Sequence, residues 1–445
     1  MSAPRRHLFT TMLLIAASVG SAATAQLLPS IGQAVGGLNN LPIVGGVLGG
    51  PSGQGGANPL SNSAPGVLRT LDTVAVDGLA GLDPATLLDL RRLRLRELVR
   101  ENGRALEMDN AGNPVRRGEL VAVNPDEGSL NAARGAGFTI LRDARSGELD
   151  LRLTILAVPR KMGAREALKR LRQAAPSIDA DYNHLFEPAG GGLAVSAGAA
   201  LAERTGAGAI RIAMIDGAVA SHPSLAGASI EQRGFAGTPA PTGHGTAVAS
   251  LLVGNQGAFH GAARGASLMV ADVFGGNRAA GSAETVVRAL SWAVARHPSV
   301  INISLVGPDN RLLARAIEAV ERRGIAVVAA VGNDGPAAPP QYPASYPGVV
   351  SVTAVDARDR ALPEAGRAAH LDFAAPGADL AAALPGGGYG RVRGTSFAAP
   401  LVAARLALAS TVARLAAEAS PGKGRIGRGI ICRACRIDPR LVGAK

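Results

Sequence analysis

The chain of 445 residues is 47% hydrophobic, which is enough apolar material for one or two full-sized cores and excludes a miniprotein that depends on disulfides. Its formal net charge of +12 suggests an anionic partner, but the arginines are spread along the whole chain and only 3% of the residues are aromatic. Since zinc-finger spacing and an RNA-binding aromatic motif are also missing, we expect no nucleic-acid partner.

The first segment in chain order has the features of a secretory signal. Arg5 and Arg6 precede an apolar run, and residues 23–25 supply a small-x-small cleavage pattern. We therefore predict a signal peptide over residues 1–25 and a secreted or periplasmic protein. No later stretch has the roughly 18 uninterrupted apolar residues that a membrane span requires, so we expect no membrane span in the mature chain.

A linker and a basic helix follow the signal. Residues 26–70 are rich in Gly, Pro and Asn without a sustained period, which is typical of a linker. The stretch "DLRRLRLRELVR" (89–100) carries leucines at near-helical spacing, and Asp83-Pro84 supplies a cap and a first-turn residue. This pattern predicts a solvated amphipathic helix, with binding to an anionic surface as the alternative.

The next region alternates between strand-like and helical character. The pattern over about 118–188 predicts the order β-α-β-β-α-β, which is the ferredoxin-like arrangement of a small independent domain. The expected strands are 118–125, two strands within 139–159 around a turn at Ser146-Gly147, and the extended segment 177–188, and the expected helices are 128–137 and 163–174.

From about Gly206 onward, short apolar β-branched runs alternate with amphipathic helices. This pattern predicts a mostly parallel, doubly wound sheet covered on both faces, in which function collects beyond the carboxyl ends of the strands. The expected strands are 209–216, 266–274, 299–305, 325–333 and 349–356; the expected helices are 282–297, 310–323 and a run that starts near Thr395.

Four polar residues stand at the predicted strand ends and helix starts. In chain order they are Asp216, His244, Asn333 and Ser396. Each has an ordinary structural interpretation, because Asp and Asn favour turns, a loop histidine needs no task, and a serine is a common N-cap. Their joint occurrence favours a catalytic constellation, and Asp, His, Ser is the chain order of the subtilisin triad.

Residues about 206–420 resemble a subtilisin-like serine peptidase of the subtilase family (peptidase S8), over most of a catalytic domain. The stretches that carry the resemblance are "IDGAVASHP", "GHGTAVAS", "INISL", "AAVGNDG", "YPASYPGVVSVTAVD", "FAAPGADL" and "GTSFAAPLVAA". The resemblance implies an α/β subtilisin-like fold and a serine endopeptidase that hydrolyses peptide bonds.

The resemblance also implies a role for each of the four residues. Ser396 would attack the scissile carbonyl, His244 would take and return its proton, and Asp216 would fix the imidazole tautomer. Asn333 and the Ser396 backbone N–H would stabilise the oxyanion.

For polypeptide substrates, the resemblance implies a binding edge at Ser304, Leu305 and Val306, which would be exposed and pair with an extended backbone. The chain departs from the family pattern where Val306 replaces a frequent glycine, and where Gly217-Ala218 follows the aspartate in place of Thr or Ser and then Gly. We predict no cofactor and no metal site. Calcium remains the alternative, because many relatives have a calcium loop after the catalytic histidine, but such a loop is not evident after His244.

The N-terminal half gains a role from the same resemblance. The region 71–190, with its core at about 118–188, resembles the propeptide that precedes and inhibits many subtilisin-like catalytic domains. We expect cleavage somewhere near 188–205 and a catalytic domain over 191–420. A permanent accessory domain that is never removed is the alternative.

Residues 421–445 form a predicted tail that holds Cys432 and Cys435. In an oxidising compartment we expect these two cysteines to form a small local disulfide. Two functional alternatives remain: a catalytically weak or inactive subtilase-fold module that binds peptides, and an envelope protein that holds anionic polymers through its basic helix.

Overall fold

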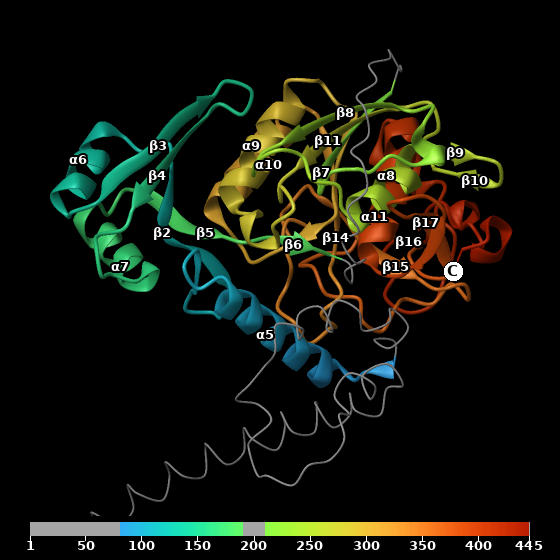
Figure 1. Cartoon of the computed structure of the whole chain (residues 1–445), viewed down its shortest axis with the longest axis horizontal. Helices are drawn as coiled ribbons and strands as arrows, with labels where there is room; N and C mark the ends of the chain where they lie inside the picture. Colours follow the sequence, from blue (N-terminus) through green and yellow to red (C-terminus); the bar gives the residue numbers. More distant parts are fainter. Residues whose placement is uncertain (1–80, 190–209, 445) are drawn as a thin grey trace, which may run out of the picture. The chain divides into compact units, whose positions relative to one another are not determined.

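The computed structural model describes residues 81–189 and 210–444 (Figure 1). The predicted signal peptide 1–25 and linker 26–70 lie outside the described residues, as does most of the predicted cleavage region. The chain divides into two compact units, Met1–Asn62 and Ser63–Lys445, and every described residue belongs to the second.

The described part begins with the predicted basic helix, α5 (Pro84–Glu101). Asp83 caps it, since the Asp83 side chain accepts hydrogen bonds from the backbone N–H groups of Ala85 and Thr86. The helix is amphipathic as predicted, with Arg92, Arg96 and Arg100 exposed to solvent. Arg91 departs from the prediction, because it is only 9% exposed. The helix leads into the short strand β1 (Leu106–Met108).

The predicted β-α-β-β-α-β order is observed in the next domain, which we call the N-terminal domain. Its antiparallel sheet has the order β3-β4-β2-β5, with β1 paired to the beginning of β2. This is the ferredoxin-like strand order. The elements are β2 (Pro114–Val123), α6 (Glu127–Gly135), β3 (Thr139–Ser146), β4 (Leu151–Ala157), α7 (Ala164–Ala174) and β5 (Asp179–His184).

The second domain, which we call the peptidase domain, is built on a seven-stranded sheet in which every neighbouring pair is parallel. The strand order is β16-β15-β14-β12-β7-β11-β8. The strands are β7 (Arg211–Asp216), β8 (Ser229–Gly234), β11 (Ser267–Asp272), β12 (Val300–Ile303), β14 (Ala326–Ala330), β15 (Val350–Val355) and β16 (Phe373–Pro376).

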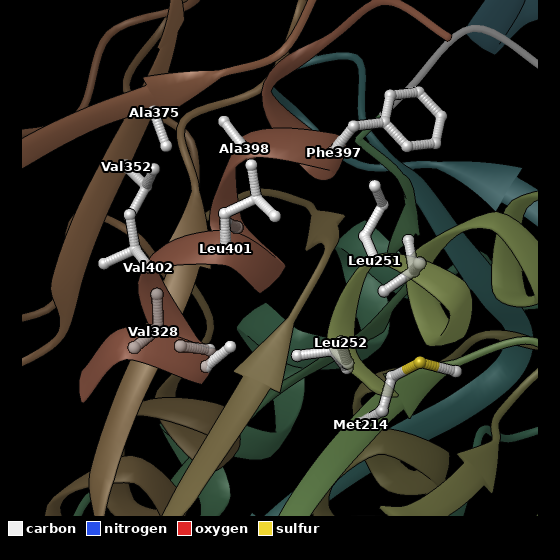
Figure 2. Close-up of a cluster of buried hydrophobic side chains, with 14 of the residues drawn as sticks. Met214, Leu251, Leu252, Val328, Val352, Ala375, Phe397, Ala398, Leu401 and Val402 are labelled. Carbon is white, nitrogen blue, oxygen red and sulfur yellow. The ribbon is translucent and has the colours of Figure 1, made fainter. Parts of the chain in front are cut away.

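Helices cover both faces of this sheet (Figure 1). Alternate residues of β7 divide between the two faces, with Ile212 and Met214 in one core and Ala213 and Ile215 in the other. One face packs against α8 (Gly243–Val253) and α11 (Thr395–Ala409), the other against α9 (Ala283–Val294) and α10 (Arg311–Glu321). Figure 2 shows the first core, where Met214 lies among side chains of α8, α11 and three further strands.

The sheet of the N-terminal domain is apolar on both faces. One face packs against α6 and α7, and the other joins the core of α9 and α10 through residues such as Val121, Leu153 and Ile155. Polar contacts border this second face: Arg142 Nη2 lies 2.7 Å from Glu284 Oε2 at the start of α9. The N-terminal domain therefore buries its open sheet face on the peptidase domain.

The remaining elements are short. The predicted disulfide between Cys432 and Cys435 is formed, and Ile431 and Ile437 of the tail lie in the peptidase-domain core. No helix of the described ranges is both long and apolar enough to cross a membrane. The other elements are β6 (Glu187–Pro188), β9 (Asn255–Gln256), β10 (Phe259–His260), β13 (Leu305–Val306), β17 (Leu380–Ala383), β18 (Tyr389–Val392) and α12 (Val412–Ala416).

A buried Asp–His pair sits where the N-terminal domain meets the peptidase domain. His184 Nε2 lies 3.1 Å from Asp109 Oδ2, and His184 Nδ1 lies 3.0 Å from the amide nitrogen of Asn310. Burial alone would raise the pKa of Asp109, but hydrogen bonds from His184 and Asn113 outweigh it and lower the pKa to about 2. The ionised Asp109 therefore stabilises the folded chain.

We expect this contribution, about 2 kcal/mol, to be fully present above about pH 5, where an unfolded aspartate is ionised, and to be lost as the pH falls through the folded pKa of about 2. The Asp109→Asn substitution should lower the urea midpoint at pH 7, and this difference should shrink progressively as the pH is lowered toward the folded pKa. Both chains would carry Ser396→Ala to prevent self-digestion. Asp89→Asn, a more exposed carboxylate paired with Arg92, is the control; an unchanged midpoint for Asp109→Asn would contradict the prediction.

Candidate active site

The site lies at the point where the strand order of the peptidase sheet reverses. Strand β7 has β11 on one side and β12 on the other. The strands that follow β7 in the chain, β8 and β11, lie on the first side, and the later strands β12, β14, β15 and β16 lie on the second. Crevices form beyond the carboxyl ends of strands at such points. Asp216 ends β7, and Ser304 directly follows β12.

Asp216 and His244 form a buried pair. His244 Nδ1 lies 2.9 Å from Asp216 Oδ1, and the two side chains are 1% and 5% exposed. His244 is the second residue of α8, whose N-cap is Thr242. Asp216 Oδ1 also accepts a hydrogen bond of 2.7 Å from the Gly217 backbone N–H. This arrangement orients the imidazole so that Nε2 is the ring nitrogen left for proton transfer.

Space beside Asp216 explains the departure from the family pattern at Gly217. A Cβ atom on Gly217 would lie 2.4 Å from Thr242 Oγ1 and 2.7 Å from its Cγ2. A hydroxyl-bearing residue therefore has no room at position 217 unless Thr242 moves. Asp216 Oδ2 is buried and, among the described residues, has no hydrogen-bond partner.

Ser396 lies at the beginning of α11, but it is not the N-cap. That position belongs to Gly394, and Ser396 is the second helical residue. Its backbone N–H is one of the first groups of the helix, which point outward with positive partial charge. Ser396 Oγ and His244 Nε2 are both buried, and neither has a hydrogen-bond partner within the described residues. No hydrogen bond therefore joins Ser396 Oγ to His244 Nε2 in this structure.

Asn333 lies just beyond β14 and is tied to the serine helix. Its Oδ1 accepts a hydrogen bond of 3.0 Å from the Thr395 N–H, and Thr395 Oγ1 accepts one of 3.1 Å from the Gly332 N–H. A Cβ on Gly394 would lie 2.8 Å from Asn333 Nδ2, and Gly394 has φ +137°, which side chains rarely adopt. Glycine at position 394 is what allows the amide to approach the helix.

The predicted substrate-binding edge is not exposed, because the chain itself occupies it. Ser304, Leu305 and Val306 are 0%, 0% and 6% exposed, and β13 pairs antiparallel with β6. The Ala189 N–H donates to the Ser304 carbonyl over 2.9 Å. Asn333 Nδ2 donates to the Ala189 carbonyl oxygen. A carbonyl of the chain therefore stands against the predicted oxyanion donor.

The occupying segment is also held on its other side. The Phe186 N–H donates to the Gly281 carbonyl over 2.7 Å, and Leu185 bridges to Ser282. The Phe186 ring fills the space above Gly307, since a Cβ there would lie 2.5 Å from the ring. Residues 185–189 thus form a middle strand between two edges of the peptidase domain.

Two further polar side chains of the peptidase domain, Ser304 and His222, form hydrogen bonds. Ser304 Oγ donates to the Ser396 carbonyl over 3.0 Å, a contact that no local sequence pattern predicts. Both ring nitrogens of His222 are engaged, by Ser224 Oγ and the Gly388 carbonyl, which marks it as structural. Within the described ranges, no group of three or more His, Cys, Asp or Glu side chains is placed to hold a metal ion.

The sequence of this chain is similar to those of known proteins. The model of the subtilase family matches residues 208–420. The Major intracellular serine protease of Bacillus subtilis (strain 168) is 34% identical over 216 residues, which cover 45% of this chain and 67% of that protein. Subtilisin Savinase of Lederbergia lenta is 35% identical over 210 residues, which cover 46% of this chain and 77% of that protein. The chain belongs to the subtilase family.

One solved structure shares the fold of this chain. Fervidolysin from Fervidobacterium pennivorans, described as a keratinolytic enzyme related to subtilisin, superimposes with a TM-score of 0.60 and 19% identity, over 76% of this subtilase and 62% of its own chain. At that identity the likeness shows the fold alone. The predicted family, the α/β fold class and the class of serine endopeptidase are confirmed.

Proposed function

We propose that this subtilase is a serine endopeptidase made as a self-processing zymogen, whose first substrate is its own Ala189–Gly190 bond. The observation that carries the proposal is the position of Ala189: its N–H is bonded to Ser304 and its carbonyl accepts from the Asn333 amide. A polypeptide bound in this way presents one carbonyl carbon to the serine helix. Within the predicted cleavage region 188–205, the proposal thus specifies one scissile bond, Ala189–Gly190.

The chemistry follows from these positions. Ser396 Oγ attacks the Ala189 carbonyl carbon while His244 Nε2 takes its proton, and Asp216 balances the imidazolium charge. The oxyanion receives hydrogen bonds from Asn333 Nδ2 and from the first N–H groups of α11. Collapse of this intermediate passes the proton from His244 to the Gly190 amine, which leaves, and Ala189 remains as an ester on Ser396. Water then attacks the ester, with His244 again as the base, and frees the Ala189 carboxylate.

The same contacts describe the substrates that the enzyme would accept in trans. Main-chain pairing on both edges is independent of side chains, so extended polypeptides of many sequences fit. The side chains of the occupying segment add preferences, for a small residue in the position of Ala189 and a large apolar one in the position of Phe186. The released N-terminal region would act as the inhibitor, because it fills this cleft.

A catalytically weak peptide-binding module is the second candidate. The observation that favours it is Asp216 Oδ2, which is buried without a hydrogen-bond partner among the described residues. A serine-directed phosphonate probe separates the two, since only a working Ser–His pair becomes labelled. Labelling of Ser396 excludes the module; absence of labelling together with peptide binding supports it.

The main experiment follows intact mass over time for the chain that starts at Gln26, with Ser396→Ala as the control. We expect two fragments, one ending at Ala189 and one beginning at Gly190, in the unaltered chain alone. A first cut elsewhere within 188–205 would contradict the proposed register, and no cut in either chain would contradict the zymogen.

We expect Asn333→Ala to lower turnover by roughly 10² to 10³, with little change in KM; this is the magnitude found when the equivalent asparagine of subtilisin is removed. The reason is that Nδ2 is the side-chain donor facing the carbonyl oxygen. Initial rates on a fluorogenic peptide would measure it. Asn333→Asp is the sharper variant, since it keeps the acceptor for the Thr395 N–H and loses the donor.

The exposed Asn255, which contacts His260, supplies the matched control as Asn255→Ala, and its turnover should not change. If Asn333→Asp retained full turnover, the oxyanion would have to be held by other groups.

We further propose that the enzyme acts outside the cytoplasm. The sequence pattern of residues 1–25 supports this, as does the Cys432–Cys435 disulfide, which persists in oxidising compartments. Recovery of the processed enzyme only from the cytoplasm of the producing cell would overturn it.

A further inference from the structure

Helix α5 stands outside the ferredoxin-like core of the N-terminal domain, and it touches the active-site loop of the peptidase domain. Arg94 Nη1 lies 3.0 Å from Asp334 Oδ1, and Arg91 Nε lies 3.2 Å from Asp334 Oδ2. Asp334 directly follows Asn333, the predicted oxyanion donor. The two arginines are three residues apart, so they project from neighbouring turns of one helix face.

The same helix reaches the segment that fills the cleft. Arg94 Nη2 lies 3.5 Å from Glu187 Oε2, and Glu187 also lies 3.5 Å from Arg278 of the peptidase domain. The side chains of Arg91, Asp334 and Glu187 are 10%, 9% and 8% exposed. Removal of the two arginines would therefore leave the buried Asp334 carboxylate without these ion-pair partners, and Glu187 with Arg278 alone. An uncompensated buried carboxylate is far more costly than the loss of a surface pair.

Apolar contacts fix the two ends of the helix. Near its beginning, Leu87 lies against Gly335, where a Cβ would meet Leu87 Cδ1 at 2.8 Å. Near its end, Leu98 forms a small buried cluster with Leu185 of the cleft segment and Ala279 of the peptidase domain. Helix α5 thus runs from the oxyanion loop to the outer end of the bound segment.

We propose that Asp334, Gly335 and Ala279 form a docking surface for α5, and that α5 is an inhibitory element separate from the segment in the cleft. The partner that this surface fits is an amphipathic helix with two arginines three residues apart, and its occupant is residues 84–101 of this chain. After cleavage at Ala189, the docked helix retains the N-terminal region and holds the oxyanion loop. This inference rests on the proposed function for its inhibitory part, but the docking itself does not require catalysis.

The docking is tested in the chain from Gln26 with Ser396→Ala, which cannot process itself. Amide hydrogen exchange is compared between this chain, an Arg91→Gln/Arg94→Gln double variant and an Arg92→Gln control. Arg92 lies on the same helix but is 58% exposed and pairs with Asp89. We expect the double variant alone to exchange at least about tenfold faster in both α5 and residues 331–335. Unchanged exchange in 331–335 would overturn the docking surface.

The inhibitory part is tested with Ser396 restored. After processing, peptidase activity is measured on a fluorogenic peptide over a dilution series, which reports release of the N-terminal region. In the double variant, we expect half of the full peptidase activity to appear at a protein concentration about 100-fold higher than in the unaltered and Arg92→Gln chains, because its N-terminal region dissociates more readily. This is the size of effect expected for the loss of a buried charge pair. Equal midpoints would overturn the retention role. If no chain is processed at all, the proposed function fails, and the exchange experiment still decides the docking.

Discussion

A Ser396→Ala chain is expected to remain whole and to turn over peptide substrates roughly 10⁶-fold more slowly, the magnitude known for loss of the nucleophile in subtilisin. The Ser396 hydroxyl is fully buried at the start of α11 and, among the described residues, has no hydrogen-bond partner, whereas the neighbouring Thr395 hydroxyl is occupied by the Gly332 N–H. Alanine removes the attacking oxygen and leaves the helix, its glycine cap and the oxyanion donor in place. The measurement is kcat on a fluorogenic peptide, together with the intact mass of the chain.

Ser177→Ala is the matched control, since this serine is exposed in the N-terminal domain and should neither slow processing nor lower turnover. Residual activity is still expected for Ser396→Ala, because substrate binding and the oxyanion donors persist. Cleavage after Ala189 in the Ser396→Ala chain at the normal rate would show that another group is the nucleophile.

The second large effect is expected for Asp216→Ala, with a loss of turnover of roughly 10⁴, again the magnitude known from subtilisin. His244 Nδ1 has Asp216 Oδ1 as its partner at 2.9 Å, so alanine leaves the imidazole without the acceptor that fixes its tautomer. The imidazolium that forms during attack also loses its counter-charge.

A double variant tests whether the two residues act as one unit. If His244 and Asp216 act only by activating Ser396, as proposed, the Ser396→Ala/Asp216→Ala chain should be no slower than Ser396→Ala alone. Asp272→Asn is the control: this aspartate ends β11 in register with Asp216 and accepts from backbone N–H groups, not from a histidine. It should lower stability but leave the turnover of folded enzyme unchanged. Additive losses in the double variant would contradict a shared mechanism.

The sequence predicted the order of elements and the four candidate residues because both depend on local patterns. Continuous apolar runs identified β7, β12 and β14; Asp216 ends β7, and Asn333 lies three residues beyond β14. His244 and Ser396 lie at the starts of α8 and α11. Strand β8 was not predicted, since "SIEQRG" at the sheet edge has a single apolar residue, Ile230, and its other buried side chain is the polar Gln232. Strand β16 was also not predicted as a strand, because its four residues follow a long irregular segment.

The features that the sequence did not predict depend on contacts between residues that lie far apart in the chain. The Arg94–Asp334 contact joins residues 240 positions apart, and nothing in the local pattern of either segment marks it. The burial of the substrate edge by residues 187–189 has the same origin. An arginine-rich helix considered alone is expected to face solvent, and only the folded chain shows that Arg91 and Arg94 contact the Asp334 carboxylate.

The hydrogen bond from the Thr395 N–H to Asn333 Oδ1 fixes the direction of the dipole of the Asn333 side-chain amide. A side-chain amide has two ends of nearly equal shape, and a freely rotating one would present its oxygen to the substrate carbonyl as readily as its nitrogen. Here the Thr395 N–H binds Oδ1, which leaves Nδ2 facing the Ala189 carbonyl. Folding therefore fixes the orientation of the Asn333 amide. Negative charge that develops on the carbonyl oxygen then meets an N–H donor that is already correctly oriented.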